Sequence, residues 1–337
     1  MAITISGSGI TSANIADGTI TTDDILASDV SSLKSGRKNL IINGAMDVWQ
    51  RGTSTTSIGA SYYTADRFWT YNPGSNSITQ SSDVPSGEGF IYSLNFPTSI
   101  NAFGQAIELP AQGKTMLRAN TSYTVSFWAK ADSSADSTTD IRYRNAKANG
   151  SGNINISANN PNTITTTWER HSFTFNTGSV APASTNNILD FEMSVGNLTN
   201  FKITGVQLEL GSVATDFEHR SYGEELALCQ RYFQSLGGVG IRTAIAAGFT
   251  STNQFYGYGV LKQTMRAEAT VTISGGFVNI QYTHTNLSAA ASANPTFIMG
   301  LDSYYITIPS AATSITNAGA YARIAAPATK VFFDAEL

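Results

Sequence analysis

The chain has 337 residues with a formal net charge of −4, and charged residues make up only 13% of it, about half the share of an average soluble domain. It has no Lys/Arg cluster beyond residues 34–38, which excludes nucleic-acid-binding proteins. No apolar run approaches the roughly 18 residues of a membrane span, and the single cysteine, Cys229, excludes internal disulfides and cysteine-based metal sites.

Residues 1–38 carry an apolar residue at every fifth position, in the decapeptides ITSANIADGT and ITTDDILASD. A helix of 3.6 residues per turn does not produce this spacing, and in a flat strand successive positions of the set point to opposite faces. One apolar side chain in five residues cannot offset the backbone entropy of ordering, about 1 to 2 kcal/mol per residue. We expect an extended arm that orders only against other chains, with a disordered leader as the alternative. Its expected contact residues are Ile5, Ile10, Ile15, Ile20, Ile25 and Val30.

Residues 39–220 consist of short alternating runs separated by Gly, Asn, Pro and Ser clusters, a pattern typical of a β-sandwich. In FKITGVQLEL the apolar phase slips by one residue at Gly205, which predicts a β-bulge. The polar stretches 131–139 and 145–163 predict surface loops, and His171 is expected in the core. The inward residues of YTVSFWAK and ILDFEMSV are expected to be Tyr123, Val125, Phe127, Ala129, Leu189, Phe191, Met193 and Val195.

One helix is predicted in SYGEELALCQRYFQSLGG, over residues 221–236. Ser221 and Glu224 have the spacing of a capping box, and two glycines end the segment. After it, FVNIQYTH, DSYYITI and KVFFDAEL predict a second small β-sandwich over residues 237–337. The apolar stripe of the helix is expected to be Leu226, Cys229, Phe233 and Leu236.

Catalytic signals are weak. A glycosidase needs two carboxylates about 5 to 10 Å apart, and the pairs Asp190/Glu192 and Asp334/Glu336 have suitable spacing on a strand. Solvated strand faces carry such pairs routinely. The three histidines are scattered, and no nucleotide-binding or hydrolase motif occurs. We therefore expect neither catalysis nor a cofactor.

Several strings together resemble known families. NLIINGAMDVWQRG (39–52), YTADRFW (63–69), YTVSFWAKA (123–131), TTTWERHSFTF (165–175) and ITGVQLELG (203–211) resemble the strands of jelly-roll carbohydrate-binding modules. ATDFEHRSYGEELALCQRYFQ (214–234), the N-terminal decapeptides and the final FDAEL resemble tail-fibre and related adhesin proteins of tailed bacteriophages. The resemblance implies an all-β fibrous homotrimer with one helix. Its parts are a virion-attachment and trimerisation arm (1–38), a jelly-roll domain (39–220), the linking helix (221–236) and a distal β domain (237–337).

The resemblance also implies a function and partners. We expect a phage tail fibre, located in the virion, whose arm binds another virion protein and whose domains bind a host-surface polysaccharide or lipopolysaccharide. A capsid-mounted fibre and a capsule depolymerase are the alternatives. Matching positions of the family suggest an ion pair between Arg51 and Asp66 that closes the sandwich. Modules of this type often hold calcium, but the acidic ligand set expected for that ion is not evident in this sequence, where Asp47 and Glu209 are the only positions to inspect. We expect no metal site.

Sugar sites pair a flat aromatic ring with polar side chains, because a sugar ring has an apolar C–H face and many hydroxyls. Some of the aromatic residues must instead fill the core; Trp49, for example, is expected in a first strand. The candidate ligand-binding residues are Trp49, Tyr62, Trp69, Tyr71, Tyr256, Tyr258, Tyr304 and Tyr305.

Overall fold

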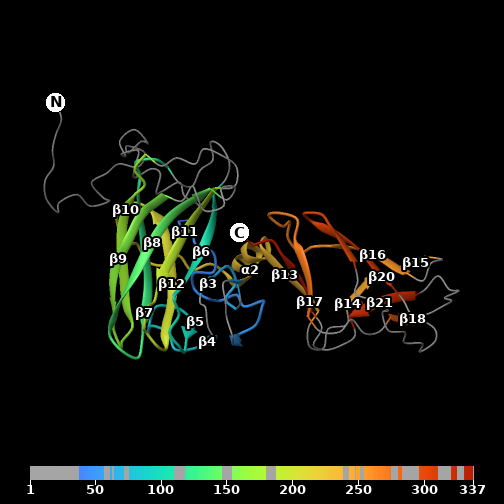
Figure 1. Cartoon of the computed structure of the whole chain (residues 1–337), viewed down its shortest axis with the longest axis horizontal. Helices are drawn as coiled ribbons and strands as arrows, with labels where there is room; N and C mark the ends of the chain where they lie inside the picture. The colour runs from blue at the N-terminus through green and yellow to red at the C-terminus, as the bar shows by residue number, and fades with distance from the viewer. Residues whose placement is uncertain are drawn as a thin grey trace, which may run out of the picture.

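The computed structural model describes residues 38–56, 61–62, 64–71, 76–109, 118–145, 154–179, 187–237, 243–246, 248–250, 254–274, 280–282, 296–309, 320–324 and 330–336. The predicted repeat arm, with Ile5, Ile10, Ile15, Ile20, Ile25 and Val30, lies outside these residues. The described part forms two β-rich units side by side, with one short helix between them (Figure 1).

The first unit is a jelly-roll β-sandwich of two six-stranded antiparallel sheets. Sheet A has the spatial order β1 (Ser54–Thr56), β4 (Ser77–Ser81), β5 (Ser93–Phe96), β12 (Phe201–Leu210), β7 (Ser122–Lys130) and β10 (Glu169–Asn176). Sheet B has the order β2 (Ser61–Tyr62), β3 (Trp69–Tyr71), β6 (Ala102–Leu109), β11 (Asn187–Ser194), β8 (Ala135–Asn145) and β9 (Ile154–Ile164). The fold class expected from the sequence is confirmed for this unit.

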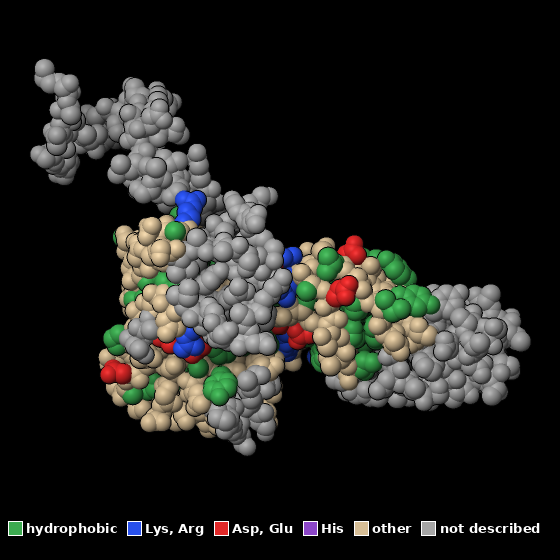
Figure 2. Space-filling model, turned by 45° about the horizontal axis from the view of Figure 1, so that its top comes forward, with side chains coloured by type: hydrophobic (Ala, Val, Ile, Leu, Met, Phe, Trp, Pro, Cys, Tyr) green, Lys and Arg blue, Asp and Glu red, His purple; other side chains and the backbone are tan. Residues whose placement is uncertain are grey.

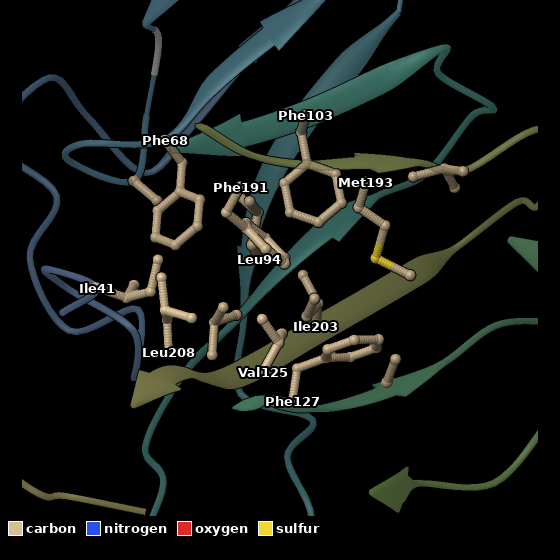
Figure 3. Close-up of a cluster of buried hydrophobic side chains, with 14 of the residues drawn as sticks. Ile41, Phe68, Leu94, Phe103, Val125, Phe127, Phe191, Met193, Ile203 and Leu208 are labelled. Atoms are coloured by element: carbon tan, nitrogen blue, oxygen red, sulfur yellow. The ribbon is translucent and has the colours of Figure 1, made fainter. Parts of the chain in front are cut away.

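The core of the sandwich lies between the two sheets. In Figure 3, Phe103, Phe191 and Met193 of sheet B face Val125 and Phe127 of sheet A. All eight inward residues predicted from the alternation of β7 and β11 have at most 1% of their surface exposed. Apolar alternation in these strands therefore locates the core correctly.

The predicted bulge in β12 is confirmed. The register of β12 against β7 shifts between Thr204 and Gln207, and Gly205 has φ of +64°. A Cβ atom at Gly205 would lie 2.6 Å from the Phe90 ring. This position therefore demands glycine both for its backbone conformation and for the space it leaves.

In the two polar stretches predicted as surface loops, residues 135–139 belong to strand β8 and residues 154–163 to strand β9, while residues 146–153 lie outside the described residues. The inner face of the two strands is polar: Ser137, Thr139 and Asn162 are buried. The Asn162 side-chain amide donates to the Thr139 hydroxyl at 3.0 Å. Hydrogen bonds between buried polar groups replace apolar contacts here, so no apolar alternation marks these strands in the sequence.

The segment around Trp49 is not the first strand predicted from the sequence. Residues 38–50 form an irregular segment, in which Asn43 has φ of +61°. The side-chain amide of Asn43 donates to the carbonyls of Val48 (2.9 Å) and Asp66 (3.0 Å), and its oxygen accepts from the Val48 amide. Side-chain hydrogen bonds hold this chain conformation in place of a strand ladder.

The linking helix is shorter than predicted. α2 spans Tyr222–Gln230, and the predicted N-cap is confirmed, since the Ser221 side chain accepts from the Glu224 amide. Phe233 lies instead in strand β13 (Phe233–Gly237), which pairs with β22 (Lys330–Asp334) near the C-terminus. This distant pairing ends the helix before the glycines do. Cys229 is fully buried, as expected.

The described residues of the second unit form three small antiparallel sheets. Sheet C has the order β13, β22 and β17 (Thr270–Ser274), and sheet D has β14 (Thr243–Ala246), β21 (Ala320–Ile324) and β18 (Ile280–Tyr282). Sheet E has the order β15 (Gly248–Thr250), β16 (Gln254–Val260), β20 (Ser303–Pro309) and β19 (Thr296–Met299). The cluster of buried side chains in this unit consists of Leu261, Met265, Ala269, Tyr304, Ile306, Val331, Phe333 and Ala335.

Candidate functional site

One row of residues crosses five strands on the outer face of sheet B. The strand registers pair Tyr62 with Trp69, Trp69 with Gly104, Gly104 with Glu192, and Glu192 with Asp140. Directly opposed residues of neighbouring strands point to the same side of a sheet. The alternate positions of β6 and β11 fill the core, so this row points away from it. Segments far apart in the sequence thus build one surface.

The aromatic half of the row lies on a floor of small residues. A Cβ atom at Gly104 would lie only 2.7 Å from Cζ2 of the Trp69 indole, so the ring lies across this glycine. Ala102 and Ala106, on the same face of β6, are also small. Beside the half-buried Trp69, the Tyr71 side chain is 54% exposed. The small residues of β6 are themselves buried, so the surface here consists of the exposed Tyr71 ring beside the half-buried Trp69 indole.

The polar half of the row is an ion-pair cluster. Arg142 pairs with Asp140 and with Glu192, each at 2.7 Å. One guanidinium is thus shared by two carboxylates, and this trio carries a net charge of −1. Burial raises the pKa of Glu192, while the charge of Arg142 lowers it and those of Asp140 and Asp190 raise it. The side chains of Arg142, Glu192 and Asp140 are 31%, 17% and 11% exposed, so Arg142 is the member of the trio most open to a ligand beside the aromatic rings.

Such an arrangement is chemically suited to a sugar. The apolar C–H face of a pyranose stacks on an aromatic ring, and its hydroxyls bind carboxylate and guanidinium groups in fixed positions. Three of the predicted aromatic residues, Tyr62, Trp69 and Tyr71, lie on this face.

The other predicted aromatic residues lie elsewhere. Trp49 is half-buried against the core of the sandwich, and its indole nitrogen donates to the Met46 carbonyl at 2.5 Å. In the second unit, Tyr258 and Tyr305 oppose each other on β16 and β20 and are exposed. The side chain of Tyr256 lies outside the described residues.

Tyr304, predicted as a candidate ligand-binding residue, faces inward instead. Only 5% of its surface is exposed, and its ring stacks on Phe333 with 5.2 Å between the centroids. Tyr304 and Tyr305 are consecutive in a strand and must point to opposite faces, so only one of them can be outward.

Three residues of the sheet B face, Asp140, Arg142 and Gly104, could not be recognised from the sequence as part of a sugar site. Asp140 and Arg142 belong to β8, of which the first part reads as a loop because its inner positions are polar. Gly104 was missed because the ring that lies over it comes from a strand more than 30 residues earlier. The one local signal for the two β8 residues is the sequence Asp140-Ile141-Arg142, in which opposite charges on either side of an apolar residue indicate a strand with a charged outer face.

In the structure, the two carboxylate pairs with the spacing of a glycosidase are buried or engaged in ion pairs. Asp190 points to the outer side of sheet B but is only 2% exposed. Asp334 and Glu336 bind Arg51 at 3.2 and 3.3 Å, and Glu336 also binds Arg67. The second pair is therefore engaged in holding the two units together.

The ion pair expected between Arg51 and Asp66 is present, with 3.9 Å between the charged atoms. Arg51 also stacks on the Phe233 ring, 3.6 Å from its centroid, and so links the jelly roll to the second unit. In Figure 2, acidic and basic side chains gather where the two units meet. Burial raises the pKa of Asp66 to about 7, although the charge of Arg51 and hydrogen bonds from Gln50 lower it.

His171 lies on the inner side of β10, where its ring stacks on Phe127 with 5.4 Å between the centroids. Burial lowers the pKa of His171, and the charge of Glu169 raises it. This histidine is a packing residue at the edge of the core.

The carboxylate of Glu209, one of the two positions considered for calcium, is already satisfied by protein donors. One Glu209 carboxylate oxygen accepts hydrogen bonds from Thr215 N and Gln207 Nε2, each at 2.9 Å, and the other accepts from Thr215 Oγ1 at 2.6 Å. Both oxygens are thus engaged by protein donors. Among the described residues, no group of three or more His, Cys, Asp and Glu is arranged to hold a metal. Within the same residues, no helix has the length and hydropathy needed to cross a bilayer.

Comparisons with known proteins agree on the first unit. The family model CBM_4_9, a carbohydrate binding domain, matches residues 66–197, which is less than half of the chain. No curated protein matches the sequence.

Similar solved structures include one titled "CBM4 structure and function", with 17% identity, a TM-score of 0.32, and coverage of 50% of this chain and 98% of that one. Another is the CBM22-1 xylan-binding domain of Paenibacillus barcinonensis Xyn10C, with 12% identity, a TM-score of 0.32, and coverage of 52% and 96%. A third is the enzymatically active domain of tailspike protein 4 of bacteriophage CBA120, with 16% identity, a TM-score of 0.33, and coverage of 51% of this chain and only 21% of that one. The first unit is thus a jelly roll that is similar, over residues 66–197, to CBM4-like carbohydrate-binding domains.

Proposed function

We propose that this chain binds an uncharged polysaccharide through the outer face of sheet B. The observation that carries the proposal is the single row in which Tyr62 and Trp69 lead across Gly104 to Glu192 and Asp140. The match of residues 66–197 to a carbohydrate-binding domain supports it independently.

The charge of the face favours an uncharged sugar. Arg142 is already paired with two carboxylates, so the trio keeps a net negative charge. A uronic or sialic acid placed beside it would meet like charge at close range, which costs binding energy. A neutral sugar instead finds acceptors for its hydroxyl groups.

The test compares Trp69→Ala with wild type in affinity electrophoresis through a panel of neutral and uronic-acid polysaccharides. We expect retardation by at least one neutral polymer and at least a tenfold loss of affinity in Trp69→Ala, equivalent to about 1.4 kcal/mol, because the substitution removes the stacking ring. Tyr222→Ala is the matched control, because this exposed tyrosine belongs to α2 and not to the face. Equal retardation of Trp69→Ala and wild type would contradict the proposal, provided that both variants keep the wild-type circular dichroism spectrum.

We also propose that the chain is a homotrimeric phage tail fibre that uses this face in host adsorption. The N-terminal decapeptides, which need partner chains to order, and the strings shared with tail-fibre proteins support this role. Three weak sites on one assembly gain avidity, because each later contact is intramolecular. The target is then the uncharged part of a host polysaccharide or lipopolysaccharide.

Deletion of residues 2–32 tests the attachment role. We expect a folded protein that no longer joins the virion, whereas incorporation at the wild-type level would contradict it. An image of the particle distinguishes a tail fibre from a capsid-mounted fibre. Oligosaccharide release from host capsule by the purified protein would favour a depolymerase instead.

A further inference from the structure

Sheet E of the second unit has two unlike faces. On its inner face, Tyr304 and Ile306 pack with Phe333 in the core of the unit. On its outer face, the registers place Tyr258 opposite Tyr305, and Tyr305 opposite Ile298. These three residues from adjacent strands therefore form one cross-strand row that points away from the core.

The outer row is highly exposed and apolar. Tyr258, Tyr305 and Ile298 are 71%, 38% and 65% exposed. Val260, two residues along β16, is 74% exposed, and Leu301, in the turn before β20, is 47% exposed. In the part of the chain that the structure describes, five of the nine exposed large hydrophobic residues thus lie in this one area. Figure 2 shows hydrophobic side chains gathered on this unit. Exposed apolar area concentrated in this way marks an interaction surface.

We infer that this face binds a second copy of the same chain. Its described strand positions carry Tyr, Val, Ile, Ser and Thr and no charged residue. The chain has a net charge of −4, so two copies repel each other on average. Association of copies is least opposed where neither contributes charge.

The chemistry of the row favours a copy of the chain over a sugar. The aliphatic side chains Ile298, Val260 and Leu301 provide neither ring stacking nor hydrogen bonds, which sugar recognition needs. Interfaces between copies, in contrast, have an apolar and aromatic centre surrounded by a polar rim. Here the hydroxyls of Ser303, Thr307 and Thr296 flank the apolar row and supply that rim.

The inference deepens the proposed assembly of copies into a fibre, since it names a surface through which they meet. It does not depend on sugar binding by sheet B. It also does not require the N-terminal arm, so the test must separate contacts at sheet E from contacts made by residues 1–38.

Disulfide cross-linking of the full chain tests the contact directly. The single native cysteine, Cys229, is fully buried, and burial raises the pKa of its thiol, so it gives little background. Ile298→Cys and Tyr258→Cys are oxidised mildly and analysed on a non-reducing gel. The matched control is Ile91→Cys, which is 62% exposed on the jelly roll.

We expect covalent dimers from at least one sheet E variant at a fraction at least tenfold above that of Ile91→Cys. Adding Ile298→Asp to Tyr258→Cys should reduce the cross-linked fraction at least tenfold, because the new carboxylate of each copy would have to be buried in the contact. Cross-linking equal to the control would overturn the inference. Persistence of the dimers after deletion of residues 2–32 supports it, and their loss on that deletion would assign the contact to the arm. Neither result bears on sugar binding, which Trp69→Ala tests separately.

Discussion

At the scale of single residues, Gly104 determines the shape of the sheet B face. A Cβ atom there would lie 2.1 Å from the Phe191 carbonyl oxygen and 2.7 Å from the Trp69 ring. The backbone contact cannot relax by a rotamer change, so either the strands or the indole must move. The glycine is thus required by a close approach of two strands and a ring.

Gly104→Ala is therefore expected to lower the free energy of unfolding by about 1 to 3 kcal/mol, the usual cost of overpacking. Displacement of Trp69 should weaken sugar binding as well. Urea unfolding and affinity electrophoresis measure the two effects. Gly223→Ala is the control, because nothing lies within 4 Å of its added Cβ in α2. If Gly104→Ala is as stable as Gly223→Ala, the close packing of Trp69 on β6 is wrong.

The buried carboxyl of Asp66 gives a pH dependence with a defined sign. Its pKa is about 7 in the folded chain and is taken as 3.8 in the unfolded chain. Between these values the folded state binds more protons, so the contribution of this group to stability rises as the pH falls from about 7 toward 3.8. Asp66→Asn should flatten the stability curve across that window. Urea unfolding at several pH values measures the slope, with the exposed Asp302→Asn as control. An unchanged slope in Asp66→Asn would show that Asp66 stays ionised in the folded protein.

Several residues of the fold and of the candidate site could be predicted from the sequence because their signals are local. Gly205 shifts an apolar phase by one position, and Ser221 precedes Glu224 at the capping distance. Trp69 and Tyr71 could be predicted as candidate sugar contacts only because they are aromatic residues. Trp49 could not be separated from them, because its position depends on the hydrogen bonds of Asn43 in an irregular segment.

At the scale of elements, β8 and β9 form a pair with a polar interior. The Asn162 amide donates to the Thr139 hydroxyl and to the Asn160 carbonyl, each at 3.0 Å. Asn162 and Thr139 are both buried. The same strand pair carries Asp140 and Arg142 on its outer face, so its internal hydrogen bonds also position the candidate sugar contacts.

Asn162→Ala should lower the free energy of unfolding by about 1 to 3 kcal/mol, because it leaves buried hydrogen-bonding groups without their partner. Thr163→Ala, one residue along on the exposed side, should change it by less than about 0.5 kcal/mol. Chemical denaturation measures both. Equal effects of the two substitutions would mean that the polar interior of this pair contributes no stability.

Neither the strands β8 and β9 nor the end of α2 could be predicted from the sequence, and the reason is the same: each depends on interactions that leave no local apolar period. The helical period continues through Phe233 and Leu236 in the sequence, yet both belong to β13. The deciding interaction is the pairing of Phe233 with Asp334, about 100 residues away in the chain. Local periodicity carries no information about such a partner. In β8 and β9 the apolar period is absent because hydrogen bonds perform its role.

At the scale of the whole molecule, two buried arginines of the jelly roll hold the end of the chain. Arg67 is 1% exposed, stacks on the Tyr232 ring at 3.5 Å and pairs with Glu336. Arg51 pairs with Glu336 at 3.3 Å and with Asp334 at 3.2 Å. Arg266 donates to the Ala335 carbonyl at 3.2 Å, which ties the same segment to the second unit. The C-terminal residues thus couple the jelly roll to the unit that carries sheet E.

Glu336→Gln should weaken this coupling strongly. It leaves the buried guanidinium of Arg67 without its counter-charge, a change that costs about 3 to 5 kcal/mol in comparable buried pairs. The matched control is Asp334→Asn, whose carboxylate is 38% exposed and is one of several partners of Arg51. The effect of Asp334→Asn should stay below about 1 kcal/mol, as for exposed ion pairs.

Differential scanning calorimetry distinguishes the outcomes: we expect one joint transition in wild type and in Asp334→Asn. In Glu336→Gln the second unit should unfold separately at a lower temperature. A single transition at the wild-type temperature in Glu336→Gln would mean that the two units are coupled through the contacts of Glu108 with Arg231 and Tyr232 instead.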